Sequence, residues 1–400
     1  MKRFDYRAKD KSTGKTIKGS IQAESERMAG KLLVEQGYIP DTITEYGKGN
    51  ILVKASNKVR AKDRIVFTRQ FSTLIAAGLP LSVSLRTIVD QTDSKGMRAI
   101  VEEILASVEA GKSLHESFEQ HPDVFNKVYV ALIAAGEMSG TLDVALKRLA
   151  DQEEKDQAML SKIRGAMIYP AIILFVIIAV LAFLMIMVVP QVAGLYADMR
   201  KELPFLTKML YGVTGFFANW WWLVGLLLAG VIVALVSYKK TPNGRKAWDG
   251  FKIRIPIFGK MFMKLYVSRF ARTLEMMLAT GVPMIDSITI AAEATNNVVV
   301  EEEYKKAINI VKGGKPLSEA LTNRRFMLPL VPQMASIGEQ SGKIDEMLGK
   351  AAQVYENELD EQIAAISTMI EPVLMVVMAI LIGVVIGGTL MPIYTLVSAI

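Results

Sequence analysis

The sequence predicts a mostly α-helical, polytopic membrane protein with two repeated cytoplasmic helical-bundle domains, three transmembrane helices and a small N-terminal ββαβ domain. Three observations carry this prediction: three long apolar runs without charges, a segment that recurs before two of these runs, and alternating apolar residues at the start of the chain. A length of 400 residues is sufficient for several domains.

The first predicted element is a small domain at residues 1–45. Apolar side chains alternate over 4–8 and 17–23, across a turn at 11–15, which is typical of a β-hairpin. A helix is expected at 24–36, ended by Gly37, followed by a strand at 39–44. A basic linker is expected at 46–62. The first residues contain no apolar signal-peptide segment, so we expect the N-terminus to lie in the cytoplasm.

A cytoplasmic helical domain is expected at 63–166, and a second copy of it lies within 239–370. The motif F-x-R-x(6)-A-x-G-x-P begins at Phe67 and again at Phe270, an offset of 203 residues, and the motif G-E-x-S-G also occurs twice. Such matches in one register indicate an internal repeat. The motif positions that we single out as structural are Gly78, Pro80, Gly136, Glu137 and Gly140 in the first copy, and Gly281, Pro283, Gly338, Glu339 and Gly342 in the second.

Each copy is predicted to be helical. Apolar side chains from Phe67 onwards recur at helical spacing, Gly78 suits the left-handed position at the end of that helix, and Pro80 suits the start of the next. The motif G-E-x-S-G separates another helix pair. The last helix of each copy meets no strong breaker before Pro170 or Pro372, so we expect it to continue towards the membrane as a stalk.

Transmembrane helices are expected at 167–190, 219–238 and 371–392, because each range contains an uncharged apolar run of about 20 residues, enough to cross a bilayer. An external loop at 191–218 and an external tail at 393–400 complete the chain. The segment after the second span carries more cations than the loop before it, which places that segment in the cytoplasm and the C-terminus outside. These cations are Lys239, Lys240, Arg245, Lys246, Lys252, Arg254, Lys260 and Lys264, against Arg200, Lys201 and Lys208.

Residues 106–113, ASVEAGKS, match a loose nucleotide-binding P-loop pattern. A true P-loop joins a strand to a helix, whereas the residues before Gly111 have helical periodicity. Ser113 and Glu116 are spaced as a helix-capping box, and the second copy places Pro316 where a magnesium-binding hydroxyl would be needed. We therefore interpret the match as accidental.

The composition leaves little room for other chemistry. There are no cysteines and two histidines, so we expect no disulfide, no cysteine nucleophile and no metal site. We also expect no cofactor and single out no catalytic residue. Lys and Arg exceed Asp and Glu by 47 to 40, which in a membrane protein is typical of cytoplasmic loops near anionic lipid, and we expect no nucleic-acid partner. A transporter is disfavoured because no span carries a mid-membrane charge.

Two positions in the third span have alternative interpretations. Gly383 and Gly387 form a G-x-x-x-G pattern, which is expected to be a helix-packing face. Glu371 lies at the cytoplasmic mouth of the span, in the place that Tyr169 occupies in the first copy. Its carboxylate is either a functional contact or an interfacial group that reaches water.

The repeat, the spans and the motifs together resemble the inner-membrane platform proteins of type IV pilus and type II secretion machines, the PilC/GspF family. The resemblance covers essentially the whole chain, and its most specific parts are the two doubled motifs, Tyr169-Pro170, the segment VVPQVAGLYADMRKELPFLT at 188–207 and the N-terminal YRAKDKSTGKTIKGSIQAES.

This resemblance implies a non-enzymatic protein of the cytoplasmic (inner) membrane. It implies as partners a hexameric pilus assembly or retraction ATPase, pilin subunits, other inner-membrane pilus proteins, the lipid membrane and a second copy of the chain in a homo-oligomer, often a dimer. It also implies that Glu371 is a candidate pilin contact. We favour a type IV pilus, with a type II secretion or DNA-uptake system as the alternative.

Overall fold

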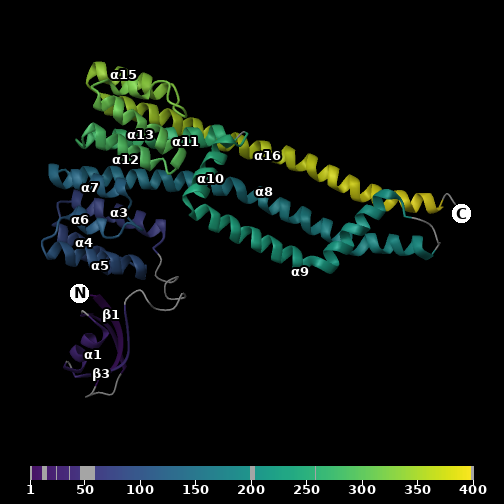
Figure 1. Cartoon of the computed structure of the whole chain (residues 1–400), viewed down its shortest axis with the longest axis horizontal. Coiled ribbons are helices and arrows are strands. Elements are labelled where there is room, and N and C mark those ends of the chain that lie inside the picture. Colours follow the sequence, from purple (N-terminus) through teal and green to yellow (C-terminus); the bar gives the residue numbers. More distant parts are fainter. Residues whose placement is uncertain are drawn as a thin grey trace. The chain divides into compact units, whose positions relative to one another are not determined.

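A computed structural model describes residues 2–10, 16–23, 25–35, 37–45, 59–198, 203–256 and 258–397 (Figure 1). Apart from a short N-terminal sheet, the described residues are predominantly helical. Two compact units are distinguished: Met1–Asn126 with Leu142–Ala150, and Lys127–Thr141 with Asp151–Ile400. Each unit is described separately below.

The first unit begins with strands β1 (Lys2–Asp10) and β2 (Thr16–Ala23), helix α1 (Glu26–Glu35) and strand β3 (Tyr38–Glu45). The strands form one antiparallel sheet in the order β2-β1-β3, with a register irregularity between Arg7 and Ala8. Gly37, expected to end the helix, has a φ of +84°. The turn expected at 11–15 lies outside the described residues.

A glycine in β2 allows an aromatic side chain to lie flat across the sheet. Tyr6 of β1 is paired with Gly19 of β2, and a Cβ added to Gly19 would lie 2.8 Å from the Tyr6 hydroxyl. The Tyr6 ring also stacks on Tyr38 at a centroid distance of 6.5 Å. A glycine at position 19 is therefore required by this close approach.

The helical part of the first unit contains α3 (Ala61–Ala76), α4 (Leu81–Gln91), α5 (Lys95–Glu109) and α6 (Leu114–Glu119). Its core includes Phe67, Phe71, Phe118 and Phe125, whose rings contact one another edge-on, stacked or tilted at centroid distances of 4.5 to 6.5 Å.

The predicted linker at 46–62 is slightly too long. Helix α3 already begins at Ala61, where the carboxylate of Asp63 accepts a hydrogen bond from the backbone N–H of Arg60 at 3.1 Å. An acidic side chain in the first turn satisfies an N–H that has no partner within the helix. Residues 46–58 of the linker lie outside the described part of the chain.

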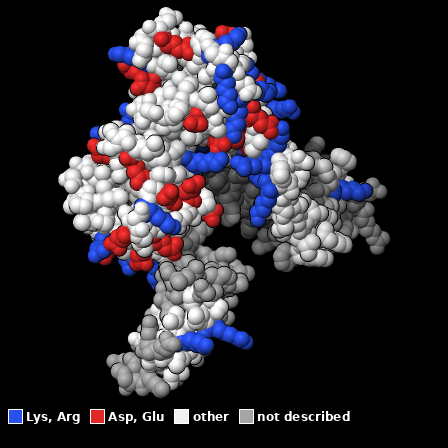
Figure 2. Space-filling model, turned by 60° about the vertical axis from the view of Figure 1, so that its left-hand side comes forward, with Lys and Arg blue, Asp and Glu red and all other residues white. Residues whose placement is uncertain are grey.

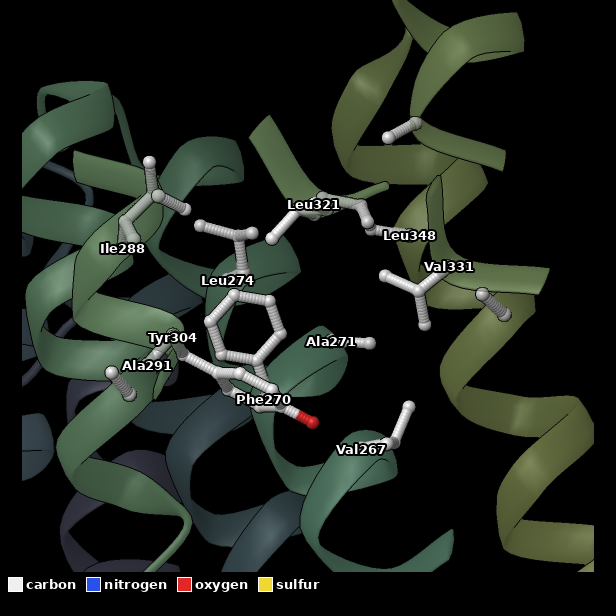
Figure 3. Close-up of a cluster of buried hydrophobic side chains, with 14 of the residues drawn as sticks. Val267, Phe270, Ala271, Leu274, Ile288, Ala291, Tyr304, Leu321, Val331 and Leu348 are labelled. Carbon is white, nitrogen blue, oxygen red and sulfur yellow. The ribbon is translucent and has the colours of Figure 1, made fainter. Parts of the chain in front are cut away.

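The second unit contains α7 (Lys127–Ser139), most of α8 (Leu142–Asp198), α9 (Phe205–Lys240), α10 (Pro242–Arg254), α11 (Phe258–Ala279), α12 (Met284–Ala294), α13 (Val298–Lys312), α14 (Leu317–Leu321), α15 (Leu330–Ser341) and α16 (Ile344–Val397). Its core surrounds α11, and Figure 3 shows Phe270 and Leu274 of that helix among side chains of α12, α13 and α16. The ring of Phe270 meets the ring of Tyr304 edge-on at 4.6 Å.

The internal repeat predicted from the sequence is visible in the helix boundaries. Helix α12 begins and ends 203 residues after α4, and α13 begins and ends 203 residues after α5. Among the described residues, α10 has no counterpart in the first copy, where residues 59–60 precede α3.

The long helices correct the sequence prediction at the prolines. Helix α8 continues through Pro170 and Pro190, and α16 continues through Pro372 to Val397, so five residues of the expected tail are helical. Proline is tolerated in long apolar helices because neighbouring groups satisfy the backbone that it frees.

The expected external loop at 191–218 is also largely helical. Residues 191–198 belong to α8 and 205–218 to α9, and both segments contribute buried side chains. Val192 and Tyr196 pack with Leu203, and this apolar contact explains why a segment rich in glycine and charge is not an open loop.

Three helices among the described residues are long and apolar enough to cross a membrane, at Leu142–Asp198, Trp222–Lys240 and Ile344–Thr389. Helix α9 bends at Trp220, whose backbone has φ −120° and ψ 17°. The predicted second span begins at this bend.

Candidate functional site

The arginine of the first motif forms a two-point ion pair with the stalk helix of its own copy. In the second copy, Arg272 of α11 donates from Nε and Nη2 to the two carboxylate oxygens of Glu356 in α16, at 3.0 and 2.9 Å. Burial alone lowers the pKa of Arg272, but the hydrogen bonds and charge of Glu356, together with Glu275, outweigh it and leave the pKa raised. Arginine suits this position because its planar fork matches a carboxylate.

The glycine and proline of the same motif form the turn between two helices. Gly281 has a φ of +81° and follows the end of α11, and Pro283 immediately precedes α12. In the first copy Gly78 has a φ of +80°, and Pro80 immediately precedes α4. A left-handed residue favours glycine, since other side chains clash with the backbone there.

The two glycines of G-E-x-S-G have different roles in the second copy. A Cβ added to Gly338 would lie 2.6 Å from the Cα of Ile344, so α15 and α16 meet through backbone contact at this position. Gly342 has a φ of +69° and caps the C-terminus of α15. Gly140 of the first copy is likewise left-handed, with a φ of +72°, and Gly136 is buried in α7.

The glutamate of G-E-x-S-G connects α15 to the start of the short helix α14. The carboxylate of Glu339 accepts hydrogen bonds from the backbone N–H groups of Leu317 and Ser318 and from the Ser318 hydroxyl. It therefore caps the short helix α14, which follows Gly314-Lys315-Pro316. The repeated glutamate could be recognised in the sequence, but its role as a hydrogen-bond acceptor at the start of α14 could not. Glu137 occupies the same motif position in the first copy.

The P-loop match lies between two helices. Helix α5 ends at Glu109, Gly111 has a φ of +85°, and Ser113 caps α6 in a capping box with Glu116. The hydrogen bonds with Ser113 lower the pKa of Glu116. Because a strand does not precede this turn, the segment lacks the geometry that wraps phosphate in a P-loop.

The two stalks contact each other before the apolar spans begin. Lys162 of α8 forms a 2.6 Å ion pair with Asp360 of α16. Met159 and Ile163 of α8 pack on a buried cluster that includes Leu359 and Ile363 of α16. The two stalks are therefore in direct contact at this level.

Glu371 and Tyr169 are both exposed on the long helices. Within the described residues Glu371 forms no ion pair with a Lys or Arg side chain, and the structure brings no other predicted site residue to it. Its surroundings are thus open to lipid, water or another protein.

The N-terminal part of α9 and the C-terminal part of α16 form a contact that was not expected from the sequence. The Thr207 hydroxyl in α9 donates to the backbone carbonyl of Gly388 in α16 at 2.7 Å, and both residues are buried. In a regular helix this carbonyl would accept from residue 392, but Pro392 has no N–H. Thr207 therefore supplies a hydrogen bond to a carbonyl that cannot accept the regular helical one from residue 392.

The glycine face of the third span differs from the predicted one. A Cβ on Gly383 would meet nothing within 4 Å, so this residue makes no close contact within the chain. The contacting glycines are Gly387 and Gly388, which lie against Leu206 and Leu210 of α9. The G-x-x-x-G pattern therefore predicted the correct part of the helix, but of its two glycines only Gly387 packs against α9.

No group of three or more His, Asp or Glu side chains suited to a metal ion occurs in the described ranges. The motif residues instead form caps, turns and ion pairs that fix helices to one another. The arrangement is that of a scaffold connected to apolar helices.

Known proteins share this organisation. Residues 67–190 and 270–392 each match the domain described as type II secretion system (T2SS), protein F, and residues 1–44 match the N-terminal domain of type II secretion system protein F. The doubled match coincides with the internal repeat.

Full-length relatives cover nearly the whole chain. The type IV pilus assembly protein PilC of Thermus thermophilus is 34% identical over 99% of this chain and 98% of its own length, and PilC of Myxococcus xanthus is 35% identical over 99% and 95%. The type II secretion system protein F of Vibrio cholerae is 32% identical over 98% of each chain. The chain therefore belongs to the PilC/GspF family, the family of type II secretion system protein F.

Proposed function

We propose that the protein is the inner-membrane platform of a type IV pilus assembly machine. The observation that carries this proposal is the similarity to type IV pilus assembly proteins along nearly the entire chain. Type II secretion system F proteins are similar over the same length, so the equivalent platform of a secretion system is the second candidate, and a DNA-uptake platform is its close variant.

The proposed platform couples a cytoplasmic hexameric ATPase to the insertion or extraction of pilin subunits. Two features support a mechanical role: α8 and α16 each continue from a bundle helix into an apolar span, and the stalks are joined by Lys162 and Asp360. The protein itself is not an enzyme in this proposal, and the energy comes from the partner ATPase.

The proposed organisation follows the boundaries expected from the sequence, with an independent ββαβ domain at 1–45 and helical domains at 63–166 and 239–370. Both helical domains and the N-terminus lie in the cytoplasm, and the C-terminus lies outside. A homo-oligomer, most simply a dimer, then presents several stalks to pilin and to other inner-membrane pilus proteins.

Deletion of the gene in its own host tests which machine the platform serves. Loss of surface pili, with pilin retained in the membrane and normal protein secretion, is the expected result. Loss of secreted proteins with normal pili would instead assign the chain to type II secretion. Normal pili, secretion and DNA uptake would contradict every version of the proposal.

We further propose that Glu371 contacts pilin. It is exposed, follows the cytoplasmic stalk and precedes the third apolar span, where an unpaired carboxylate is costly in lipid.

The variant Glu371→Gln tests this contact, because it removes the charge while keeping the size of the side chain. Glu361→Gln is a matched control on an exposed site of the same helix. The proposal expects membrane insertion in both variants but loss of pili only in Glu371→Gln; wild-type piliation in that variant would show that the residue is merely interfacial.

A further inference from the structure

The second copy contains a groove built on α10, a helix without a counterpart among the described residues of the first copy. Its volume is about 560 Å³. The groove is lined by three cations and several apolar or small residues: Lys246, Arg254, Arg325, Asn243, Ala247, Gly250, Phe251, Ile253, Val299 and Phe326.

The cations of the groove are only partly neutralised. Lys246 is paired with Glu302 at 2.6 Å, whereas Arg254 and Arg325 are exposed and form no salt bridge among the described residues. Among the described residues that line the groove there is no Asp or Glu. Two arginines are therefore available to an anionic group.

The start of α10 is fixed at the end of the second apolar span. The Thr241 hydroxyl accepts from the N–H of Gly244 at 3.1 Å, and a Cβ on Gly244 would lie 1.9 Å from the Tyr238 carbonyl oxygen. Lys239 places its ammonium 3.4 Å from the ring centroid of Trp248. These contacts hold a tight turn, and Figure 1 shows α10 leaving the direction of α9 instead of extending it.

The other wall of the groove has a strained backbone. Phe326 has a φ of +71°, which is unfavourable for a bulky side chain, and the Tyr304 hydroxyl donates to its carbonyl at 2.8 Å. The guanidinium of Arg325 lies 4.7 Å from the Phe326 ring centroid. The fold thus maintains an unfavourable conformation where it presents an arginine to the groove.

We propose that this groove binds the headgroup of an anionic phospholipid, with the phosphate facing Arg254 and Arg325. Phe251, whose side chain is 56% exposed, lies beside the acyl chain. The inference rests on the membrane placement of α9 and is independent of whether the machine makes a pilus or secretes proteins.

The position of the groove favours lipid over an acidic protein segment. Only Thr241 separates the apolar span from α10, and phospholipid headgroups are the anions present at that depth. Figure 2 shows Lys and Arg side chains gathered on the side of the second bundle that leads to the apolar helices. An exposed aromatic residue beside cations is typical of interfacial helices.

A site-specific fluorescence measurement tests the proposal. The chain has no cysteine, so Asn243→Cys allows one fluorophore to be attached to the groove of the full-length protein in nanodiscs. Phosphatidylglycerol or phosphatidylcholine carrying a nitroxide near the head of an acyl chain serves as the quencher. The expected result is stronger quenching by phosphatidylglycerol.

Charge-removal variants then separate the groove from the general attraction of anionic lipid. Arg254→Gln with Arg325→Gln is expected to lower the preference for phosphatidylglycerol by about fivefold for each arginine. Lys312→Gln with Lys343→Gln removes the same charge from exposed sites that do not line the groove, and is expected to retain the preference. Normal circular dichroism and gel filtration of both variants establish that they are folded.

Four outcomes would overturn the proposal. Equal quenching by the two lipids, or a preference unchanged in the arginine variant, would mean that the groove does not select an anionic headgroup. Quenching by neither lipid would mean that no lipid occupies the groove and would favour an acidic protein segment as its ligand. Loss of the preference on adding inorganic phosphate, at a concentration equal to that of the anionic lipid, would identify a soluble-anion site instead.

Discussion

The glycines of the G-E-x-S-G turns are required by the backbone, and the requirement differs from one position to the next. Gly342 is left-handed with open space around its Cα, whereas Gly338 has ordinary helical geometry but touches the backbone of α16. A Cβ at position 342 is disfavoured by the left-handed backbone conformation. A Cβ at position 338 is disfavoured because it would clash with the backbone of α16.

Replacing Gly342 by alanine is expected to lower the free energy of unfolding by about 1 kcal/mol, since an L-residue is unfavourable in the left-handed region. Gly165→Ala is the matched control: Gly165 lies within α8, has no atom within 4 Å of an added Cβ, and is expected to tolerate alanine or be stabilised by it. Thermal unfolding in detergent measures both. Equal melting temperatures for the two variants would contradict the assignment.

Glu293 is expected to make stability depend on pH. Lys127 of α7 and Lys305 of α13 each form an ion pair with its carboxylate, at 2.9 and 2.8 Å. Burial raises the pKa of Glu293, but the hydrogen bonds and charges of the two lysines outweigh this and lower the pKa below its ordinary value of 4.5. Its stabilising contribution is therefore complete above that value and is lost as pH falls through the folded-state pKa.

The variant Glu293→Gln tests this dependence. Its free energy of unfolding should fall less steeply than that of the wild type as the pH is lowered below 4.5. Glu319→Gln, which breaks the exposed pair with Lys315, is the control and should retain the wild-type slope. A wild-type slope in Glu293→Gln would remove this residue from the acid response.

At the scale of elements, the contact between α9 and α16 depends on a missing backbone donor. The Gly388 carbonyl cannot accept the regular helical hydrogen bond from residue 392, which is proline, and Thr207 supplies a hydrogen bond to it. Thr207→Val should therefore cost about 1 kcal/mol of stability, while Thr207→Ser, which keeps the hydroxyl, should cost less.

A double-mutant cycle with Pro392→Ala tests the cause. Alanine restores the N–H that the Gly388 carbonyl accepts in a regular helix, so Thr207→Val should cost less in that background. Additive effects of the two substitutions on the unfolding free energy would show that the proline is not the reason for the threonine contact.

The helices that follow local rules could be predicted from the sequence, and those that depend on packing could not. Gly78 and Pro80 mark the turn between α3 and α4, and the repeat located α12 and α13. Residues 191–218 were expected as a loop because they lie between two apolar runs. The segments at 191–198 and 205–218 are instead helical, and they bury Tyr196 and Leu210.

The candidate site shows the same division. The motif glycines could be assigned from their spacing, since a left-handed turn has a strong residue preference. The role of Glu339 as the cap of α14, and the groove on α10, could not be predicted, because each joins residues that are distant in sequence.

At the scale of the whole molecule, the cation asymmetry around the second span predicts the direction of all three spans. The segment from Lys239 to Lys264 carries eight cations, against three in residues 191–218. This asymmetry predicts that both helical domains lie inside and that the C-terminal ends of α8 and α16 and the N-terminal end of α9 lie outside. Thr207, a natural choice for a labelling site between the first two spans, is fully buried, so a neighbouring exposed residue is needed.

The topology is therefore tested with single cysteines at Lys112, Lys208 and Tyr394, all of which are exposed in the structure. An impermeant thiol reagent applied to spheroplasts is expected to label Lys208→Cys and Tyr394→Cys but not Lys112→Cys, because only the first two positions face outward. Detergent permeabilisation should make Lys112→Cys reactive, which serves as the control for thiol accessibility. Labelling of Lys112→Cys in sealed spheroplasts, with Lys208→Cys protected, would mean that the membrane orientation is the reverse, and that the cations after α9 do not determine it.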